Sequence, residues 1–340
     1  MIGFQTSGEV MLAIRLRAVL LVVGILMGIS GTAAAEPTAV ARCIVHDPRL
    51  TELSGLASDG KRWYAINDGG EHVAVFVLDR GCKVHRRITA PLDPYDVEDL
   101  ALARDGSLWL SDTGDNLQQR DTVAMIKVSP AGKTTLYRLT YSDGPHDAEA
   151  LLLDRRGTPY IVTKSISGVA GVYTPVGKPS SQGPTAMKQV GTVTLHSTET
   201  KGGPIPGFIG SVTVTGGAVS ASGTVVALRT YTEAYLYRAP DGDVPAALRS
   251  KPVRIPLPKE VQGEAIAIEP DGTLLSAGEG EDQPVREVRD AVSLLPALVP
   301  RDQGSTQGKG LATGPAIVVT GTMIGVVVLG WRGVRKLRAG

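Results

Sequence analysis

Short apolar runs separated by tight turns recur along the chain, and five of these segments follow one pattern. Each begins with a small apolar run, passes through a turn built on Asp-Gly, Arg-Gly or Ser-Gly, and ends in a second run rich in Val, Leu, Ile, Trp or Tyr. Asp-Gly between two apolar runs predicts a β-hairpin, because glycine tolerates the positive φ that such a turn requires. The turn glycines recur at intervals of roughly 50 residues and are Gly60, Gly106, Gly157, Gly223 and Gly272.

Two further strand-like segments follow each of the first four hairpins, as "HVAVFVLD" and "KVHRRITA" do after the first. Four strands per repeat, at a period near 50 residues, are typical of the blades of a β-propeller. The last repeat has only "PVREVR" as a third strand, and the N-terminal segment "ARCIVHD" is the candidate for the fourth. We therefore predict an all-β fold, a β-propeller of five four-stranded blades closed by an N-terminal strand. A count of six blades is the first alternative, because the interval after Gly157 contains the segment "STETKGGPIPGFIG", which is long for a connection. A two-sheet sandwich is the alternative architecture.

The N-terminal segment 1–35 has the pattern of a secretory signal peptide. Arg15 and Arg17 precede an apolar run, and small residues follow this run up to Ala35, which suits cleavage after Ala35. A signal anchor that stays in the membrane is the alternative, although the apolar run is short for a span of roughly 20 residues. We expect residues 36–300 to form an exported propeller domain.

Near the C-terminus, segment 311–331 is apolar and uncharged, and the tail 332–340 that follows it is basic. This order predicts a transmembrane helix whose tail lies in the cytoplasm, because basic residues favour the cytoplasmic side of a membrane. The polar segment 301–310 predicts a flexible stalk. We therefore expect a single-pass protein of the cell membrane with an extracellular N-terminal domain.

Charge and cysteine usage narrow the classes of partner. The net charge of the chain is +1, and several basic residues lie in the two end segments, so acidic residues outnumber basic ones between them. This balance speaks against a nucleic-acid partner. The two cysteines, Cys43 and Cys82, lie in the part expected to be exported, where an oxidising compartment favours a disulfide between them. Two buried free thiols are the alternative, and neither cysteine has a histidine at zinc-site spacing.

Four segments carry a resemblance to a known family: "DVEDLALARDGSLWLSDTGDN", "DGPHDAEALLLDRRGTPYIVTK", "ALRTYTEAYLY" and "QGEAIAIEPDG". They resemble exported β-propeller proteins of actinobacteria that are grouped with phytase-like (esterase-like) and gluconolactonase-like propellers. The resemblance extends from Leu53 to Gly280 and implies an exported propeller domain. The calcium and catalytic residues of true propeller phytases and lactonases have no position-by-position match in this chain, so none of them is transferred.

Three glutamates occupy the same place in three repeats, eight residues before the turn glycine. In a blade, the innermost strand starts on the face where the second strand ends, so residues at both places gather at one mouth of the central channel. Carboxylates that converge there repel one another. Calcium, which takes six to eight oxygen ligands, would offset this repulsion. The candidate calcium ligands at this mouth are Glu98, Asp99, Asp112, Glu149 and Glu264.

Lys164 and Arg229, which follow or end second strands, are alternative partners of these carboxylates and candidate binders of an anion. Hydrogen bonds from backbone amides are a third way to stabilise the carboxylates, and they would make the group a purely structural network. The stretch "DTGDN" does not have the spacing of an EF-hand, and its residues are good turn formers. We therefore predict a capped loop between strands at this stretch.

The chain contains no G-x-S-x-G elbow, H-E-x-x-H pair, phosphate-binding loop or dinucleotide fingerprint. This favours a binding or scaffold module at the cell surface, whose ligand is an unidentified extracellular protein or small molecule. The alternative is a calcium-dependent hydrolase of phosphoesters, esters or lactones, in which Lys164 and Arg229 neutralise an anionic substrate at the channel mouth. Because function resides in the site and not in the fold, the geometry of this mouth distinguishes the two hypotheses.

Overall fold

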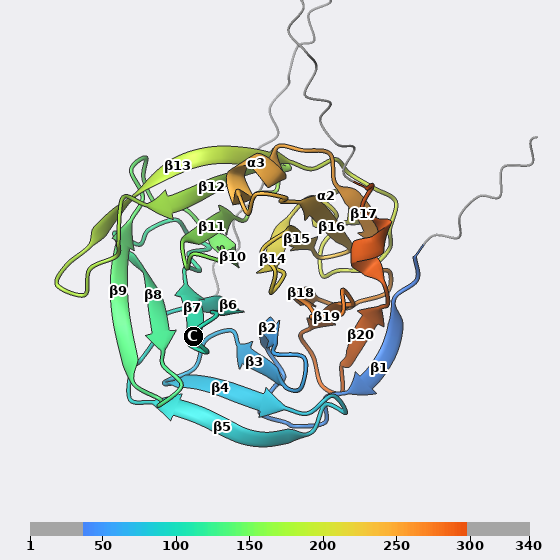
Figure 1. Ribbon diagram of the computed structural model, residues 1–340, viewed down its shortest axis with the longest axis horizontal. Helices are drawn as coiled ribbons and strands as arrows, with labels where there is room; N and C mark the ends of the chain where they lie inside the picture. Colours follow the sequence, from blue (N-terminus) through green and yellow to red (C-terminus); the bar gives the residue numbers. More distant parts are fainter. Residues whose placement is uncertain (1–36, 298–340) are drawn as a thin grey trace, which may run out of the picture. The chain divides into compact units, whose positions relative to one another are not determined.

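The computed structural model describes residues 37–297, and this part of the chain contains twenty β-strands. The strands form four-stranded antiparallel units that follow one another around a central axis (Figure 1). Two of the units belong to one eight-stranded sheet, because their outer strands meet in a short parallel pairing of Thr185 with Leu139 and of Ala186 with Thr140. The fold is all-β, as predicted, and the five units of the described part are consistent with a β-propeller.

Each blade is an antiparallel sheet whose strands run in chain order from the axis outward, except that the outermost strand of blade 5 comes from the N-terminal end of the described chain. Blades 1 and 2 consist of β2 (Leu53–Ser58), β3 (Trp63–Asn67), β4 (Val73–Leu78) and β5 (Val84–Ala90), and of β6 (Val97–Leu102), β7 (Leu108–Asp112), β8 (Val123–Val128) and β9 (Thr134–Thr140). Blades 3 and 4 consist of β10 (Ala148–Leu153), β11 (Pro159–Thr163), β12 (Val169–Pro175) and β13 (Thr185–Thr194), and of β14 (Val214–Val219), β15 (Val225–Thr230), β16 (Glu233–Arg238) and β17 (Val253–Pro256). Blade 5 consists of β18 (Gly263–Ile268), β19 (Leu274–Gly278), β20 (Pro284–Val288) and β1 (Val40–Ile44).

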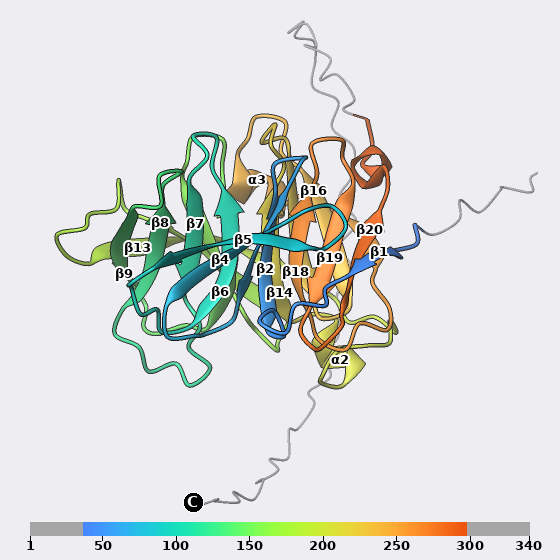
Figure 2. The ribbon, with the colours of Figure 1, turned by 90° about the horizontal axis from the view of Figure 1, so that it is seen from below.

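The two faces of the ring differ in the connections that they carry. The five inner hairpins, as predicted, turn on one face, named here the hairpin face, and Gly106 has the positive φ of 77° that its turn requires. The loops that lead into the inner strands lie on the opposite face, named here the mouth face. In Figure 2 the mouth face is the lower side, where α2 (Gly207–Gly210) lies, and α3 (Val244–Leu248) lies toward the hairpin face. A 3₁₀ helix, Ala291–Leu294, follows β20.

The hydrophobic core of the described part is divided into clusters that lie between neighbouring blades. Side chains alternate along a strand, so that Val226 and Leu228 of β15 pack against blade 3, whereas Val225 and Ala227 pack against blade 5. Five such clusters lie at the five successive interfaces around the ring. This arrangement excludes the two-sheet sandwich. The long connection between β13 and β14 contains α2 and no sixth blade.

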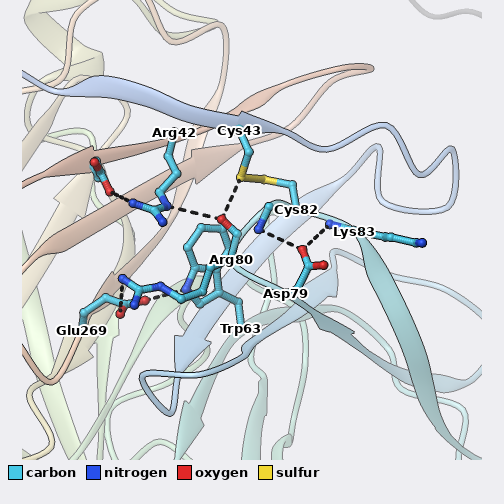
Figure 3. The surroundings of a disulfide bond; sticks show 10 residues. Arg42, Cys43, Trp63, Asp79, Arg80, Cys82, Lys83 and Glu269 are labelled. Atoms are coloured by element: carbon cyan, nitrogen blue, oxygen red, sulfur yellow. Dashed lines mark hydrogen bonds and ion pairs between the residues drawn. A yellow bond between two sulfur atoms is a disulfide. The ribbon is translucent and has the colours of Figure 1, made fainter.

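The ring is closed between its last and first blades by a strand, a disulfide and a polar contact. Strand β1 pairs antiparallel with β20, as predicted for "ARCIVHD". The disulfide between Cys43 and Cys82, which confirms the predicted pairing, joins β1 to the turn between β4 and β5 (Figure 3). Beside it, the Glu269 carboxylate of blade 5 accepts a hydrogen bond from Trp63 Nε1 at 2.5 Å and pairs with Arg80 at 3.2 Å (Figure 3). Blade 5 is therefore held to blade 1 by covalent and non-covalent contacts.

The predicted signal peptide (1–35), stalk (301–310), transmembrane helix (311–331) and basic tail (332–340) lie outside the described residues. Within residues 37–297, no helix has the length and apolar character that crossing a membrane requires. Export and membrane anchoring therefore stay predictions from the sequence.

Candidate functional site

Each inner strand has a register shift close to its start. In β6, Val97 pairs with Asp112 and Asp99 pairs with Ser111, which leaves Glu98 out of the ladder. An extra residue of this kind bends the strand and re-aims the side chain. The residues at the five shifts are Ser54, Glu98, Glu149, Thr215 and Glu264. The three glutamates that share one place in the repeat thus share one structural position, at the mouth-face end of the inner strands.

Within residues 37–297, seven carboxyl groups gather on the mouth face around the ammonium group of Lys164. Their electrostatic interactions connect them to one another and to Lys164, and two sets of three place their carboxylate oxygens within 4.8 Å of one another. Those two sets are Asp68, Asp96 and Glu98, and Glu98, Asp147 and Glu149. This group is named the axial acidic cluster, and its members are Asp68, Asp96, Glu98, Asp147, Glu149, Glu264 and Glu279.

Burial raises the proton affinity of the carboxyl groups in the axial acidic cluster. It raises the pKa of Asp96 to about 7 and the pKa of Glu149 to about 8, although Lys164 opposes the shift at Glu149. The pKa values of Glu98 and Glu264 are raised well above the ordinary value, first by burial and then by the neighbouring Glu149 carboxylate. Without a further cation, several of these groups therefore hold protons near neutral pH.

Two carboxylates of the cluster have no partner in the part of the chain that the structure describes. Glu98 is 5% exposed and Glu264 is 4% exposed, and neither carboxylate forms a hydrogen bond or an ion pair. Their neighbours are engaged, since Glu149 pairs with Lys164 and Asp147 Oδ1 accepts the backbone N–H of Asp115 at 2.8 Å. Their oxygens are not among the fully buried polar atoms that lack a partner in the described residues, so they open onto the channel. A carboxylate that is largely removed from water and has no partner is unfavourable. It is stabilised either by a proton or by a cation that binds in the mouth.

The loop after β7 is shaped around these carboxylates. Gly114 lies so close to Asp96 and Glu98 that a Cβ at this position would overlap the carboxylate oxygens of both. Arg120 fixes the loop by donating hydrogen bonds to the backbone oxygen of Gly114 at 2.6 Å and to Asp112 Oδ1 at 2.8 Å. The "DTGDN" stretch is thus a fixed loop between strands, as predicted, and it also forms one wall of the mouth.

Asp99, one of the predicted calcium ligands, is fully buried between the inner strands. Its carboxylate accepts the backbone N–H groups of Leu100 at 2.8 Å, Leu151 at 2.8 Å and Gly217 at 3.0 Å. Burial raises the pKa of Asp99 well above its ordinary value, and the three backbone donors oppose this shift. Asp99 therefore ties the inner strands of blades 2, 3 and 4 together.

Asp112, a second predicted ligand, is likewise surrounded by donors. It accepts the backbone N–H of Tyr95 at 3.1 Å, the backbone N–H of Asp96 at 3.0 Å and the guanidinium of Arg120. These bonds join the end of β7 to the loop that enters β6. Of the five predicted ligands, the structure thus leaves three, the register-shift glutamates Glu98, Glu149 and Glu264, facing the mouth.

The two cations predicted to bind an anion are both paired with carboxylates. Lys164 Nζ is bonded to Glu149. Burial lowers the pKa of Lys164, but its neighbours, Glu149 first and then Tyr231 and Glu264, together outweigh burial and the pKa is raised. Arg229 is fully buried and paired with Glu260. Lys164 therefore stays charged at the mouth, whereas Arg229 belongs to the contact between blades 4 and 5.

Asp68 and Asp96 belong to the cluster although the repeat pattern does not mark them as ligands. Asp68 directly follows β3 and Asp96 directly precedes β6, and their two carboxyl groups interact with one another. Their sequence signal is an acidic residue next to a strand end on the mouth face. Both places recur in part, because Asp147 directly precedes β10 as Asp96 precedes β6, and Glu279 directly follows β19 as Asp68 follows β3. The repeat therefore carries this signal, although neither place is acidic in every blade.

No family model and no curated protein matches this chain. Among solved structures, a protein assigned as a gluconolactonase is similar at 15% identity and a TM-score of 0.38, over 67% of this chain and 71% of that one. The PQQ-bound aldose sugar dehydrogenase from Streptomyces coelicolor is similar at 10% identity and a TM-score of 0.40, over 75% and 99% of the two chains. Virginiamycin B lyase from Staphylococcus aureus is similar at 9% identity and a TM-score of 0.36, over 74% and 73%. Likeness at this level says nothing about what the present chain binds or does.

Proposed function

We propose that this propeller binds a hard divalent cation, with calcium as the first candidate, in the mouth of its central channel, and that it uses this site to hydrolyse an ester, phosphoester or lactone. One observation carries the proposal: Glu98 and Glu264 are almost completely buried at the mouth, and their carboxylates have no partner among the described residues. Carboxylate oxygens are the ligands that calcium prefers. The carboxylates close enough to share a cation are Asp68, Asp96 and Glu98 in one set and Glu98, Asp147 and Glu149 in the other. Glu264 lies beside Glu149 and adds its negative charge to the site.

Hydrolysis is supported by carboxyl groups whose proton affinity lies near neutral pH. In the cation-free protein the pKa values of Asp96 and Glu149 are about 7 and about 8. A cation bound beside them would favour their ionised forms, in which a carboxylate that does not ligate the cation is able to accept a proton from water. Lys164 adds a positive charge next to Glu149, where it stabilises an anionic substrate or the negative charge that develops on it. A bound calcium would polarise the carbonyl or phosphoryl oxygen of the substrate.

The first test is the melting temperature of the purified protein in calcium and in excess chelator. We expect calcium to raise it, because a ligand that binds only the folded state adds roughly 2.7 kcal/mol of stability at a hundredfold excess over its dissociation constant. Glu98→Gln should abolish the rise, whereas Glu199→Gln, a change at an exposed glutamate outside the cluster, should preserve it. A melting temperature that is the same in calcium and in chelator contradicts the cation site.

The second candidate function, a binding module, is supported by a different observation. Among the described residues, the five most exposed large hydrophobic side chains all belong to loops on the mouth face. Two of them, Tyr95 and Leu117, line a hollow of about 710 Å³ that also includes Asp96 of the acidic cluster. The five side chains and their exposed fractions are Tyr95 (74%), Leu117 (75%), Ile166 (71%), Phe208 (65%) and Val261 (63%).

Solvent-exposed apolar side chains that surround a polar depression are a feature of interaction surfaces. The two functions are separated by assaying the calcium-loaded protein against ester, phosphoester and lactone substrates. Turnover that is lost in Glu149→Gln supports hydrolysis. Calcium binding without turnover of any of the three classes favours the binding module.

We further propose that the propeller acts outside the cell and is anchored in the cell membrane by segment 311–331. The support for this location is the apolar and basic pattern of the two ends of the sequence. Protease added to intact cells should digest the propeller and leave the basic tail 332–340 protected. Full protection of the propeller in intact cells contradicts this location.

A further inference from the structure

A second cavity opens on the hairpin face, at the other end of the central channel. Its volume is about 660 Å³, and all five inner hairpins contribute to its wall. The wall is formed largely by apolar side chains, among them Leu56, Leu102, Leu153, Val219 and Ile268. A concave and mostly apolar site of this size falls within the range of small-molecule binding sites, about 300–1,000 Å³.

The cavity is separate from the axial acidic cluster. Leu100 and Gly217 line it, and the backbone N–H groups of both donate hydrogen bonds to the fully buried Asp99. Because the Asp99 carboxylate also accepts the backbone N–H of Leu151, it draws three inner strands together between the two ends of the channel. A ligand in the cavity therefore binds without contact with the calcium ligands proposed for the mouth face.

Each acidic side chain on the wall of the cavity is neutralised by a basic neighbour. The pKa values of Asp59 and Asp105 are both lowered, because hydrogen bonds and basic neighbours outweigh the opposing effect of burial. The carboxylates are therefore charged but paired. The three ion pairs are Asp59–Arg62 at 3.5 Å, Asp105–Lys127 at 3.0 Å and Asp154–Arg156 at 3.2 Å.

Two arginines on the wall remain without an acidic partner among the described residues. Arg104, in the turn between β6 and β7, is exposed and forms no ion pair. Arg155, in the turn between β10 and β11, donates one long hydrogen bond, 3.4 Å, to the backbone oxygen of Asp241. Together with the three neutral ion pairs, they leave an excess of positive charge at the opening of an apolar cavity.

We propose that the cavity on the hairpin face binds a small apolar carboxylate. The apolar body of the ligand lies among the inner strands, where it is removed from water. Its carboxylate lies at the opening, where Arg104 donates charge-assisted hydrogen bonds to it. Arg155, whose guanidinium lies against Gly242 of blade 4, adds its positive charge to this side of the opening. This inference does not depend on the cation site or on the hydrolytic activity proposed for the mouth face.

The test compares octanoate with octanamide, which has the same body and no charge, by calorimetric titration of the full chain in excess chelator. We expect octanoate to bind at one site about tenfold more tightly than octanamide, because only octanoate interacts with the arginines as an ion. Trp109 lines the cavity, so its fluorescence should change as the site fills. Arg104→Gln should lower the affinity for octanoate and leave the affinity for octanamide unchanged. Arg138→Gln, an exposed arginine of β9 outside the cavity, should leave both unchanged.

Three results overturn the inference. The first is equal affinity for octanoate and octanamide, or no saturable binding of either. The second is equal weakening of octanoate by Arg104→Gln and Arg138→Gln, which indicates a general charge effect. The third is a fluorescence response to octanoate that is as large in a Trp109→Phe variant as in the native protein, although calorimetry still detects binding. The ligand then lies away from Trp109 and outside the cavity.

Discussion

A single methyl group at position 114 is predicted to disturb the axial acidic cluster. The Cβ of Gly114→Ala would overlap the carboxylates of Asp96 and Glu98, so both must shift. Overpacking of this kind destabilises by about 1–3 kcal/mol, and displaced carboxylates bind a cation less tightly. We expect a lower free energy of unfolding in urea and a smaller rise of the melting temperature in calcium. Gly183→Ala is the matched control, because no atom lies within 4 Å of a Cβ there, and equal effects of the two variants would contradict the prediction.

Arg229 is predicted to stabilise the folded protein and not to bind an anion. It is fully buried and paired with Glu260, which also accepts a hydrogen bond from Ser276 Oγ at 2.7 Å. Arg229→Met removes the fully buried partner of Glu260, which then keeps only Arg286 at 3.5 Å and the Ser276 hydroxyl. The free energy of unfolding should fall by about 3 kcal/mol, because the buried carboxylate is then only partly neutralised.

Two further variants test this reading of Arg229. Replacing both partners, in Arg229→Met with Glu260→Leu, should recover much of the loss, because no charge is then buried without a partner. Breaking the exposed pair of Lys127 and Asp105 should change the free energy of unfolding by about 0–1 kcal/mol. A loss of stability at Arg229 that is as small as at Lys127 would show that the buried pair is not needed.

At the scale of the element, strand β1 depends on its disulfide to close the ring. Cys43 and Cys82 are 39 residues apart, and the loop-entropy estimate for a crosslink of this length is about 4 kcal/mol. The double variant Cys43→Ala with Cys82→Ala should lose stability of this order in urea unfolding. Hydrogen exchange should accelerate in β1 and β20, because their pairing then depends on the ladder hydrogen bonds and the Arg42–Glu287 ion pair without a covalent link. Reducing agent should reproduce the loss in the native protein and have no effect on the double variant.

The hairpin pattern allowed most elements to be predicted, because each inner hairpin depends on local information: two apolar runs and a turn glycine. The eight-residue spacing that marks Glu98, Glu149 and Glu264 does not hold in the first blade. Glu52 lies eight residues before Gly60, but the register shift falls at Ser54, because the turn of this hairpin is shorter. Glu52 is exposed, and Ser54 donates its hydroxyl to the backbone oxygen of Glu98. Register shifts therefore have to be seen in the ladder itself.

At the scale of the whole molecule, the sequence indicated where carboxylates converge but not which of them are already satisfied. The donors to Asp99 include backbone N–H groups of Leu151 and Gly217, which are far away in the chain and come close only in the closed ring. Arg229 and Glu260 likewise meet only when blades 4 and 5 pack. The cavity on the hairpin face is marked by no motif, since the turn glycine that its five hairpins share indicates a turn and not a binding site.

In the absence of calcium, the buried carboxyl groups at the mouth are together expected to make the stability of the protein depend on pH. Burial raises the pKa of Glu98, Glu149 and Glu264 above the ordinary glutamate value, to about 8 for Glu149, where Lys164 opposes the shift. The Glu149 carboxylate adds to the shift at Glu98 and Glu264. Between roughly pH 4.5 and 8, the folded state therefore holds protons that the unfolded state has released, so its stability falls as the pH rises. Calcium favours the ionised carboxylates and should flatten this fall. Urea unfolding across this pH window measures the slope of stability against pH, once with chelator and once with calcium. Combining Glu98→Gln with Glu264→Gln should reduce the slope that is measured in chelator. Stability that rises with pH in chelator would mean that these carboxylates are stabilised as ions by the protein itself, and the need for a cation in the mouth would disappear.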